Sequence, residues 1–257
     1  MRMKAAFHTL GCKVNQYETE ALILKFREQG YEITGEQDYA DVYVINTCTV
    51  TGLADRKSRQ YIRRMKKVNP NSIVAVTGCY AQIKPEEVSS IDGVDIVAGT
   101  NEKSKLPEYV KEFLQDGIPK LRVLDYEELS CYEETGLVTA TESRTRAYIK
   151  IQEGCDRFCS YCVIPYARGR VRSRSLEDIV SEARTLIGQG VREIILTGIN
   201  TALYGADLGQ DVEVVIKALN QLPGEFRIRL SSLEPTVVNE DYVKRLFQYD
   251  RLCHHLH

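Results

Sequence analysis

The sequence lacks any apolar run of the roughly 18 residues that a membrane-spanning helix requires. It also lacks the hydrophobic region of a signal peptide, because Ala5-Ala6-Phe7 is too short for one, although Leu10-Gly11-Cys12 is similar to a lipoprotein cleavage site. Neither charge sign dominates, since 34 basic residues face 36 acidic ones and the formal net charge is −2. These absences predict a protein that is neither inserted into a membrane nor exported. Any binding of nucleic acid must come from local basic patches.

Two nucleotide-binding signatures are missing as well. The sequence contains neither the GxGxxG pattern of dinucleotide-binding folds nor the GxxxxGK[ST] pattern of a P-loop. The chain has 257 residues, 43% hydrophobic and 27% charged, which is typical of one large or two ordinary globular domains. It also has eight cysteines. Without a signal peptide, these favour metal binding in a reducing cytoplasm over disulfides.

Three of the cysteines stand close together in a CxxxCxxC spacing, at Cys155, Cys159 and Cys162. Thiolates are soft ligands that favour iron–sulfur clusters or zinc. Three thiolates are one short of the four that usually hold a [4Fe–4S] cluster, so one iron would stay open to a small molecule. The alternative is that Cys159 and Cys162 form half of a zinc site or a redox pair. A zinc ribbon needs a second CxxC, which the sequence lacks, so a cluster is the favoured interpretation.

The first 117 residues alternate between short apolar runs and helical patterns. Strands are predicted over residues 4–12, 42–45, 72–76 and 94–98, and helices over about 15–30, 55–68 and 103–115. Asn15 is placed to cap the first helix, with Glu18 three residues on in the capping-box position. This alternation predicts a wound α/β domain with a parallel sheet over residues 1–117.

Cys12, Cys48 and Cys79 each fall at the carboxyl end of a predicted strand. Wound sheets bind ligands in the crevice at these carboxyl ends, so the three cysteines should converge although they are distant in sequence. One such cysteine is most simply a buried structural residue. Three at equivalent places favour a second metal site made of three thiolates.

Residues 118–145 are polar and predict a connector, whereas residues 146–257 repeat a strand–helix pattern. Strands are predicted over 147–152, 191–196 and 226–230, with a fourth beginning at Leu252, and helices over about 175–190, 212–222 and 238–248. Such repeats are typical of (βα) barrels, whose active sites lie on the loops after the strands. Four units are too few to close a barrel, so we expect a partial barrel and a fragment of a longer chain.

Two local patches are strongly basic. Residues 55–67 hold seven lysines and arginines, among them Arg63 and Arg64, with only Asp55 to offset them. The second patch consists of four alternating arginines that an extended segment would place on one side: Arg168, Arg170, Arg172 and Arg174. A solvated surface is the ordinary explanation of such runs. Contact with phosphate groups is the more specific alternative.

These residues together resemble a known family. The CxxxCxxC loop with Tyr161 before its last cysteine is similar to that of the radical S-adenosylmethionine enzymes, and the chain from residue 4 to its end resembles the methylthiotransferases among them. The motifs that carry the resemblance are His8-Thr9-Leu10-Gly11-Cys12-Lys13-Val14-Asn15, Val44-Ile45-Asn46-Thr47-Cys48-Thr49-Val50, Val76-Thr77-Gly78-Cys79-Tyr80-Ala81-Gln82, the CxxxCxxC loop, and Ile164-Pro165-Tyr166-Ala167-Arg168-Gly169.

The resemblance implies two [4Fe–4S] clusters and S-adenosylmethionine as cofactors. The first cluster would chelate S-adenosylmethionine at its open iron and supply the electron that cleaves it to a radical. The auxiliary cluster would carry the sulfur to be transferred. Their ligands would be Cys155, Cys159 and Cys162 for the first and Cys12, Cys48 and Cys79 for the second. Tyr161 would lie beside the adenine, and the S-adenosylmethionine site would also include Thr197, Gly198, Ser232 and Glu234.

Within the family, residues 8–15 look most like those of tRNA N6-threonylcarbamoyladenosine methylthiotransferases, which modify carbon 2 of the adenosine at position 37, next to the anticodon. The resemblance implies that the anticodon loop of tRNA is bound, and it assigns tRNA contacts to Arg63, Arg64, Arg168 and Arg170. It also implies an electron donor such as flavodoxin or ferredoxin.

Four other functions stay open, one of which is a zinc-dependent nucleic-acid module. Enzymes that modify isopentenyladenosine in tRNA and those that modify an aspartate of ribosomal protein S12 differ from this sequence around Cys12. A non-catalytic iron–sulfur electron carrier belongs to a different class, since it has no use for an open iron. The rest of the barrel and the RNA-binding TRAM domain of the family are absent from this sequence.

Overall fold

A computed structural model describes residues 2–136 and 145–257, which form two compact units. Unit 1 comprises residues 1–129, 133–136 and 157–169, and unit 2 comprises residues 130–132, 137–156 and 170–257. Part of the predicted connector, residues 137–144, lies outside the described residues. The segment 157–169 belongs to unit 1, although in the chain it lies between two parts of unit 2.

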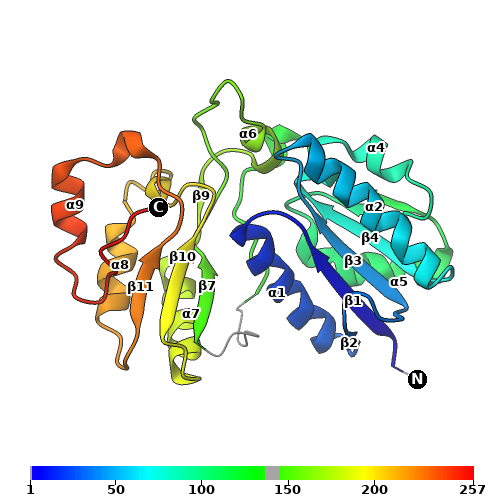
Figure 1. Cartoon of the computed structure of the whole chain (residues 1–257), viewed down its shortest axis with the longest axis horizontal. Coiled ribbons are helices and arrows are strands. Elements are labelled where there is room, and N and C mark those ends of the chain that lie inside the picture. Colours follow the sequence, from blue (N-terminus) through cyan, green and yellow to red (C-terminus); the bar gives the residue numbers. More distant parts are fainter. Residues whose placement is uncertain (1, 137–144) are drawn as a thin grey trace. The chain divides into compact units, whose positions relative to one another are not determined.

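Unit 1 is built on a parallel sheet of six strands in the order β2-β1-β3-β4-β5-β6, as far as the described residues show (Figure 1). The strands are β1 (Lys4–Thr9), β2 (Glu32–Thr34), β3 (Val42–Thr47), β4 (Ile73–Gly78), β5 (Ile96–Ala98) and β6 (Lys120–Arg122). The predicted wound sheet is confirmed. β2 and β6 were not predicted, because three residues at a sheet edge are too few to show an apolar period.

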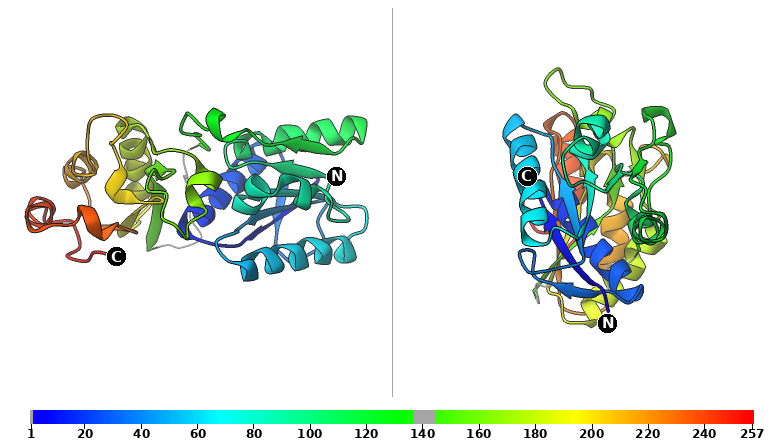
Figure 2. Two further views of the ribbon diagram at one scale, coloured as in Figure 1. Left: turned by 90° about the horizontal axis from the view of Figure 1, so that it is seen from above. Right: turned by 90° about the vertical axis from the view of Figure 1, so that its right-hand side faces the viewer.

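Helices cover both faces of this sheet (Figure 1, Figure 2). On one face α1 (Lys13–Glu28) and α5 (Leu106–Asp116), which follows the 3₁₀ turn η1 (Lys103–Lys105), bury Leu22, Phe26 and Val110 against the strands. On the other face α2 (Gly52–Val68), α3 (Cys79–Ile83) and α4 (Pro85–Ser89) cover a second apolar cluster that contains Ile62 and Met65. Because both faces are buried, the central strands β3 and β4 are buried along their whole length and are apolar up to their last two residues.

The start of α1 differs from the prediction. Cys12, not Asn15, occupies the N-cap position, and it makes no side-chain cap. The Asn15 side chain instead donates to the carbonyl oxygens of Leu10, at 2.7 Å, and Thr47, at 3.0 Å. The predicted capping box is therefore wrong, because Asn15 ties together the loops after β1 and β3.

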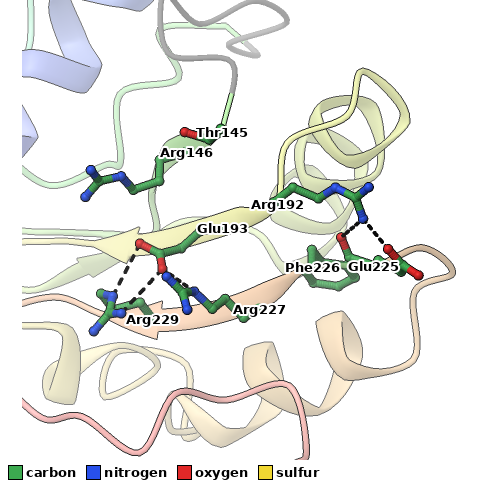
Figure 3. A pocket seen from close by; sticks show the side chains of 8 residues that line it. All are labelled: Thr145, Arg146, Arg192, Glu193, Glu225, Phe226, Arg227 and Arg229. Atoms are coloured by element: carbon green, nitrogen blue, oxygen red, sulfur yellow. Dashed lines mark hydrogen bonds and ion pairs between the residues drawn. The ribbon is translucent and has the colours of Figure 1, made fainter.

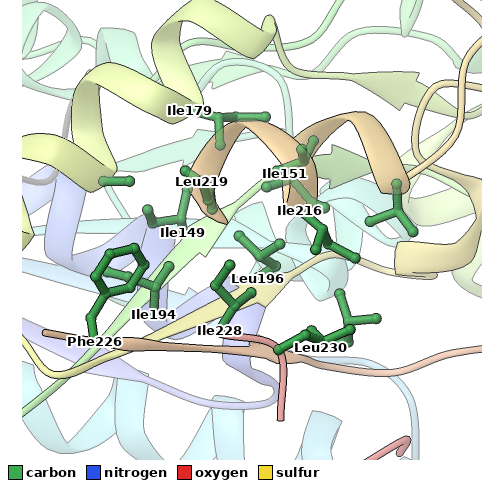
Figure 4. Packing of buried hydrophobic residues seen from close by; sticks show 14 of the residues in the cluster. Ile149, Ile151, Ile179, Ile194, Leu196, Ile216, Leu219, Phe226, Ile228 and Leu230 are labelled. Carbon is green, nitrogen blue, oxygen red and sulfur yellow. The ribbon is translucent and has the colours of Figure 1, made fainter. Parts of the chain in front are cut away.

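Unit 2 contains a parallel sheet in the order β11-β10-β7, formed by β7 (Arg146–Lys150), β10 (Glu193–Thr197) and β11 (Arg227–Leu230). One face packs on α7 (Leu176–Gly188) and α8 (Glu213–Asn220), with Ile194 and Ile228 among the buried residues (Figure 4). Sequential parallel strands with helices on one side are the arrangement expected of a partial (βα) barrel. The fourth predicted strand appears as one parallel bridge between Leu252 and Ile228.

The remaining elements of unit 2 are short. β8 (Gln152–Glu153) and β9 (Arg172–Ser173) form an antiparallel pair, and α9 (Glu240–Leu246) packs near α8. Ser175 caps α7 by accepting a hydrogen bond from the backbone N–H of Asp178. Single 3₁₀ turns are η2 (Tyr126–Glu128) in unit 1 and η3 (Thr201–Leu203) and η4 (Pro235–Val237) in unit 2. No helix within residues 2–136 and 145–257 has the length and apolar content needed to cross a membrane.

Candidate functional site

The cysteines of unit 1 lie at the carboxyl ends of three neighbouring strands. Cys12 follows β1, Cys48 follows β3, and Cys79 is the first residue of α3 after β4. Cys48 and Cys79 are buried, whereas Cys12 is exposed. The edge of the sheet where wound folds bind ligands therefore carries all three thiols.

Two glycines let the loops that carry these cysteines approach one another. A Cβ atom on Gly11 would lie 3.1 Å from Sγ of Cys48, so the loop before Cys12 packs directly on that thiol. A Cβ atom on Gly78 would lie 2.3 Å from the carbonyl oxygen of Thr47, which is closer than any side chain tolerates. Gly78 also has a φ of 97°, a backbone conformation that favours glycine. Both glycines thus keep the loops after β1, β3 and β4 in contact.

The pKa of the Cys48 thiol responds to the other two thiols. Burial is the main reason that the pKa of the Cys48 thiol is raised, and the thiols of Cys79 and Cys12 raise it further. The nearby Arg168 guanidinium acts in the opposite direction. In the described part of the chain, no group of three or more histidine, cysteine or acidic side chains is close enough together to hold a metal ion. Three soft thiol donors at one sheet edge are the ligand type that iron–sulfur clusters and zinc prefer.

Arg168 approaches the same thiols from α6 (Ile164–Arg168), which belongs to unit 1. Its Nε donates to Sγ of Cys79 at 3.2 Å, and its Nη1 donates to Oε1 of Glu18 at 2.6 Å. Thr100 donates to the carbonyl oxygen of Ala167 at 3.0 Å and so holds the same turn by its backbone. Sequence analysis missed this cluster because its members come from distant parts of the chain.

The alternating arginines do not form one solvated strip. Arg168 is fully buried, and Arg172 and Arg174 are also buried, whereas Arg170 is exposed. Arg174 pairs with Glu182 at 2.5 Å, and Arg172 donates to the carbonyl oxygen of Cys131. The prediction of an extended strip with its side chains on one surface is therefore wrong. The structure leaves Arg170 as the exposed member.

The CxxxCxxC loop spans the boundary in the chain between the two units. Cys155 is grouped with unit 2, and Cys159 and Cys162 with unit 1. The backbone N–H of Cys162 donates to the carbonyl oxygen of Cys159 at 2.8 Å, so these two cysteines sit on one tight turn. Phe158 has a φ of 46°, an uncommon value for a residue with a side chain. Tyr161 is 90% exposed and projects from this loop into solvent.

The other residues assigned to S-adenosylmethionine lie at strand ends of unit 2. Thr197 ends β10 and Gly198 follows it, while Ser232 and Glu234 follow β11. Asn200 connects these loops, since its Nδ2 donates to Oε2 of Glu234 at 3.2 Å. The Thr197 hydroxyl is buried and has no hydrogen-bond partner among the described residues. It is a polar group available to a ligand.

Gln152 is a site residue that sequence analysis missed. Its Oε1 accepts the backbone N–H of Asn200 at 3.0 Å, and its Nε2 donates to the carbonyl oxygens of Glu153 and Gly154 at 2.7 Å each. A Cβ atom on Gly198 would lie 2.9 Å from the same Oε1, so glycine is needed for this contact. Gln152 thereby joins the end of β10 to the chain that leads into Cys155. Its position at the end of a predicted strand was the available signal.

A pocket of about 540 Å³ lies at the opposite, amino-terminal ends of the unit 2 strands (Figure 3). Arg146, Glu193 and Arg227 stand in register at the first residue of their strands. Burial opposes ionisation of Glu193, but hydrogen bonds from Arg229 and Arg227 lower its pKa overall. In these ion pairs, Glu193 and the two arginines neutralise one another's charge. The pocket is remote from the strand ends that carry the cysteine loop.

The basic helix predicted from sequence is α2, and only some of its basic side chains form ion pairs within the protein. Arg59 pairs with Glu87 at 3.0 Å, and Lys66 pairs with Asp95 at 3.0 Å. Arg63 and Arg64 are exposed, and Arg64 donates to the side chain of Gln37. Both arginines are thus accessible to a phosphate backbone.

Comparison with known proteins identifies the family. Residues 4–99 match the family described as "Uncharacterized protein family UPF0004", and residues 149–257 match the "Radical SAM superfamily". A protein of Bacillus subtilis named threonylcarbamoyladenosine tRNA methylthiotransferase MtaB is 46% identical over 98% of this chain and 56% of its own length. The chain belongs to the radical S-adenosylmethionine methylthiotransferases. Membership of the radical S-adenosylmethionine superfamily implies S-adenosylmethionine and a [4Fe–4S] cluster as cofactors.

Other relatives of this methylthiotransferase chain carry two different names. A protein of Aquifex aeolicus, also named threonylcarbamoyladenosine tRNA methylthiotransferase MtaB, is 41% identical over 99% of the chain and 62% of its own length. A tRNA-2-methylthio-N(6)-dimethylallyladenosine synthase of Clostridium perfringens is 34% identical over 97% of the chain and 57% of its own length. The chain therefore spans only a little over half the length of these curated relatives.

Among solved structures, the radical S-adenosylmethionine methyltransferase TsrM from Kitasatospora setae, with cobalamin and a [4Fe–4S] cluster bound, has a similar fold. The TM-score is 0.65 at 14% identity, over 96% of the methylthiotransferase chain and 59% of TsrM. At this identity the likeness concerns the fold alone. It confirms the predicted class, an α/β fold like that of a radical S-adenosylmethionine enzyme.

Proposed function

We propose that this chain is part of a tRNA methylthiotransferase that attaches a methylthio group to carbon 2 of N6-threonylcarbamoyladenosine at position 37. The observation that carries the proposal is the presence of two separate three-thiol groups in one chain. One consists of Cys12, Cys48 and Cys79 at the strand ends of unit 1, and the other is the CxxxCxxC loop. Each is one ligand short of the usual four for a [4Fe–4S] cluster, so each would leave an iron open.

The two clusters would divide the chemistry. When bound, the cofactors supply an electron, a sulfur atom, a methyl group from one S-adenosylmethionine and a radical from another. The residues Cys155, Cys159 and Cys162 would hold the cluster that meets S-adenosylmethionine. Those of unit 1 would hold the cluster that presents sulfur.

The strand ends of unit 2 would bind and orient S-adenosylmethionine. Gln152 and Asn200 keep the loops after β10 and β11 in fixed positions, as their hydrogen bonds indicate. The Thr197 hydroxyl and the Glu234 carboxylate would receive polar groups of the ligand. Tyr161, exposed on the cluster loop, would cover the adenine ring.

Several further assignments belong to this proposal. The electron donor would be a protein such as flavodoxin or ferredoxin, and the reaction would take place in the cytoplasm. Residues 1–117 would form the auxiliary-cluster domain, 118–145 a connector and 146–257 the radical domain. The contacts to tRNA would come from Arg63, Arg64 and Arg170, because Arg168 is buried.

The test is a substrate comparison with the reconstituted chain. It is incubated under anaerobic conditions with S-adenosylmethionine, a reductant and tRNA that carries either N6-threonylcarbamoyladenosine or isopentenyladenosine, and the nucleosides are then analysed by mass spectrometry. We expect the methylthio group only on the first. Methylthiolation of isopentenyladenosine, or of ribosomal protein S12 in a parallel reaction, would replace the proposed substrate. S-adenosylmethionine that neither binds nor is cleaved would favour an electron carrier.

Charge reversal at Arg63 and Arg64 should weaken tRNA binding by removing phosphate contacts. The expected result for Arg63→Glu/Arg64→Glu is a lower affinity and a reduction of about 2 in the slope of log affinity against log salt. Titration of tRNA at several salt concentrations measures both. Arg27→Glu/Lys111→Glu is the control, since it makes the same charge change at exposed residues of α1 and α5, on the other face of the sheet. Equal effects of the two variants would exclude α2 as the contact surface.

A further inference from the structure

Arg168 links the segment of Cys159 and Cys162 to the auxiliary cysteine site. Both cysteines and Arg168 lie in residues 157–169, which pack within unit 1. The Nε of Arg168 donates to Sγ of Cys79 at 3.2 Å. A guanidinium with no exposed surface is costly to bury unless it is fully engaged, so this placement needs an explanation.

The rest of the guanidinium is held by α1. Its Nη1 donates to Oε1 of Glu18 at 2.6 Å, and Nη2 donates to Oδ1 of Asn15. Glu18 also pairs with Lys103, and all three charged side chains are fully buried. Because the planar fork is fixed on these partners, the remaining donor, Nε, is directed at the cysteine sulfur.

A hydrogen bond to a cluster thiolate stabilises the more negative, reduced state of the cluster and so raises its reduction potential. A flexible ammonium group does not supply this directed donor. The backbone is held as well, since the hydroxyl of Thr100 donates to the carbonyl oxygen of Ala167 while its backbone N–H donates to Oε1 of Gln82. The position of Arg168 is thus fixed from both its side chain and its main chain.

We propose that Arg168 is a positioning residue of the auxiliary cluster, which raises the reduction potential of that cluster through its hydrogen bond to Cys79. The same side chain ties the turn that carries Cys159 and Cys162 to the auxiliary site. This role rests on the proposed function, because it requires a cluster on Cys12, Cys48 and Cys79.

The test is a redox titration followed by electron paramagnetic resonance. The parent is the chain with Cys155, Cys159 and Cys162 changed to alanine, so that its cluster is the auxiliary one. Arg168→Met/Glu18→Gln is made in this parent and leaves the net charge unchanged. Arg174→Met/Glu182→Gln is the matched control, because that ion pair in unit 2 is equally buried. Arg168→Lys is a second variant that keeps the charge and loses the Nε donor.

Both Arg168 variants are expected to lower the midpoint potential, by about 59 mV if the ratio of reduced to oxidised cluster falls tenfold. The control should match the parent. Loss of iron from Arg168→Lys, which leaves the pair of Glu18 with Lys103 in place, would also support the role. Loaded variants with the potential of the parent, or an equal shift in the control, would overturn it. A parent that binds no iron would overturn the two-cluster proposal as well, so the two failures are distinguishable.

Discussion

Replacing Cys155, Cys159 and Cys162 with alanine is expected to halve the iron of the reconstituted chain, from about eight to about four atoms. The same loss is expected when Cys12, Cys48 and Cys79 are replaced, because each group would hold its own four-iron cluster. Replacing all six should leave no bound iron. Iron and acid-labile sulfide per chain, measured after anaerobic reconstitution, give the result directly.

The chain offers a matched control for this experiment. Cys131 and Cys253 are outside both groups, so Cys131→Ala/Cys253→Ala changes cysteines without touching the proposed ligands. This variant should keep about eight irons. If the wild type holds only about four and the Cys155, Cys159 and Cys162 variant holds none, then unit 1 binds no cluster. The chain would then be an ordinary radical enzyme, and the proposed transfer of sulfur would be wrong.

The strand ends could be located from sequence because their signals are local. An apolar run followed by a turn residue defines β3 or β4, and a cysteine placed directly after it must lie at the carboxyl edge of a parallel sheet. The same logic located Thr197 and Ser232 after β10 and β11. The order of the strands in the sheet could not be predicted in the same way. In the structure β1, β3 and β4 are neighbours, and no local sequence pattern determines that order.

The polar groups behind the cysteines could not be predicted, because their partners are far away in the chain. Glu18 looked like a capping residue of a helix, yet it pairs with Arg168, which is 150 residues away. The alternation of arginines from residue 168 looked like an extended strip, but α6 extends to Arg168 and Gly169 follows with a φ of 70°. The side-chain alternation of an extended strand therefore does not begin at Arg168. Charge patterns in a sequence do not reveal which arginine finds a buried carboxylate.

The close approach of the loops after β3 and β4 makes Gly78 the position where one methyl group should have the largest effect. Its φ of 97° and ψ of −169° fall in a region that is essentially restricted to glycine. A Cβ atom there would also lie 2.3 Å from the carbonyl oxygen of Thr47 and 2.6 Å from Oδ1 of Asn46. We expect Gly78→Ala to lower the free energy of unfolding by about 2 to 5 kcal/mol, the sum of backbone strain and overpacking.

Gly30→Ala separates these two causes. Gly30 also has a positive φ, of 89°, but a Cβ atom there would meet nothing within 4 Å. Its replacement should therefore cost only about 1 to 2 kcal/mol, from the backbone alone. Urea denaturation of both variants measures the difference. Because relief of the clash would move Cys79 away from Cys48, Gly78→Ala should also lose about four irons, whereas Gly30→Ala should lose none. Equal stability and equal iron in the two variants would show that the loops after β3 and β4 do not need this close contact.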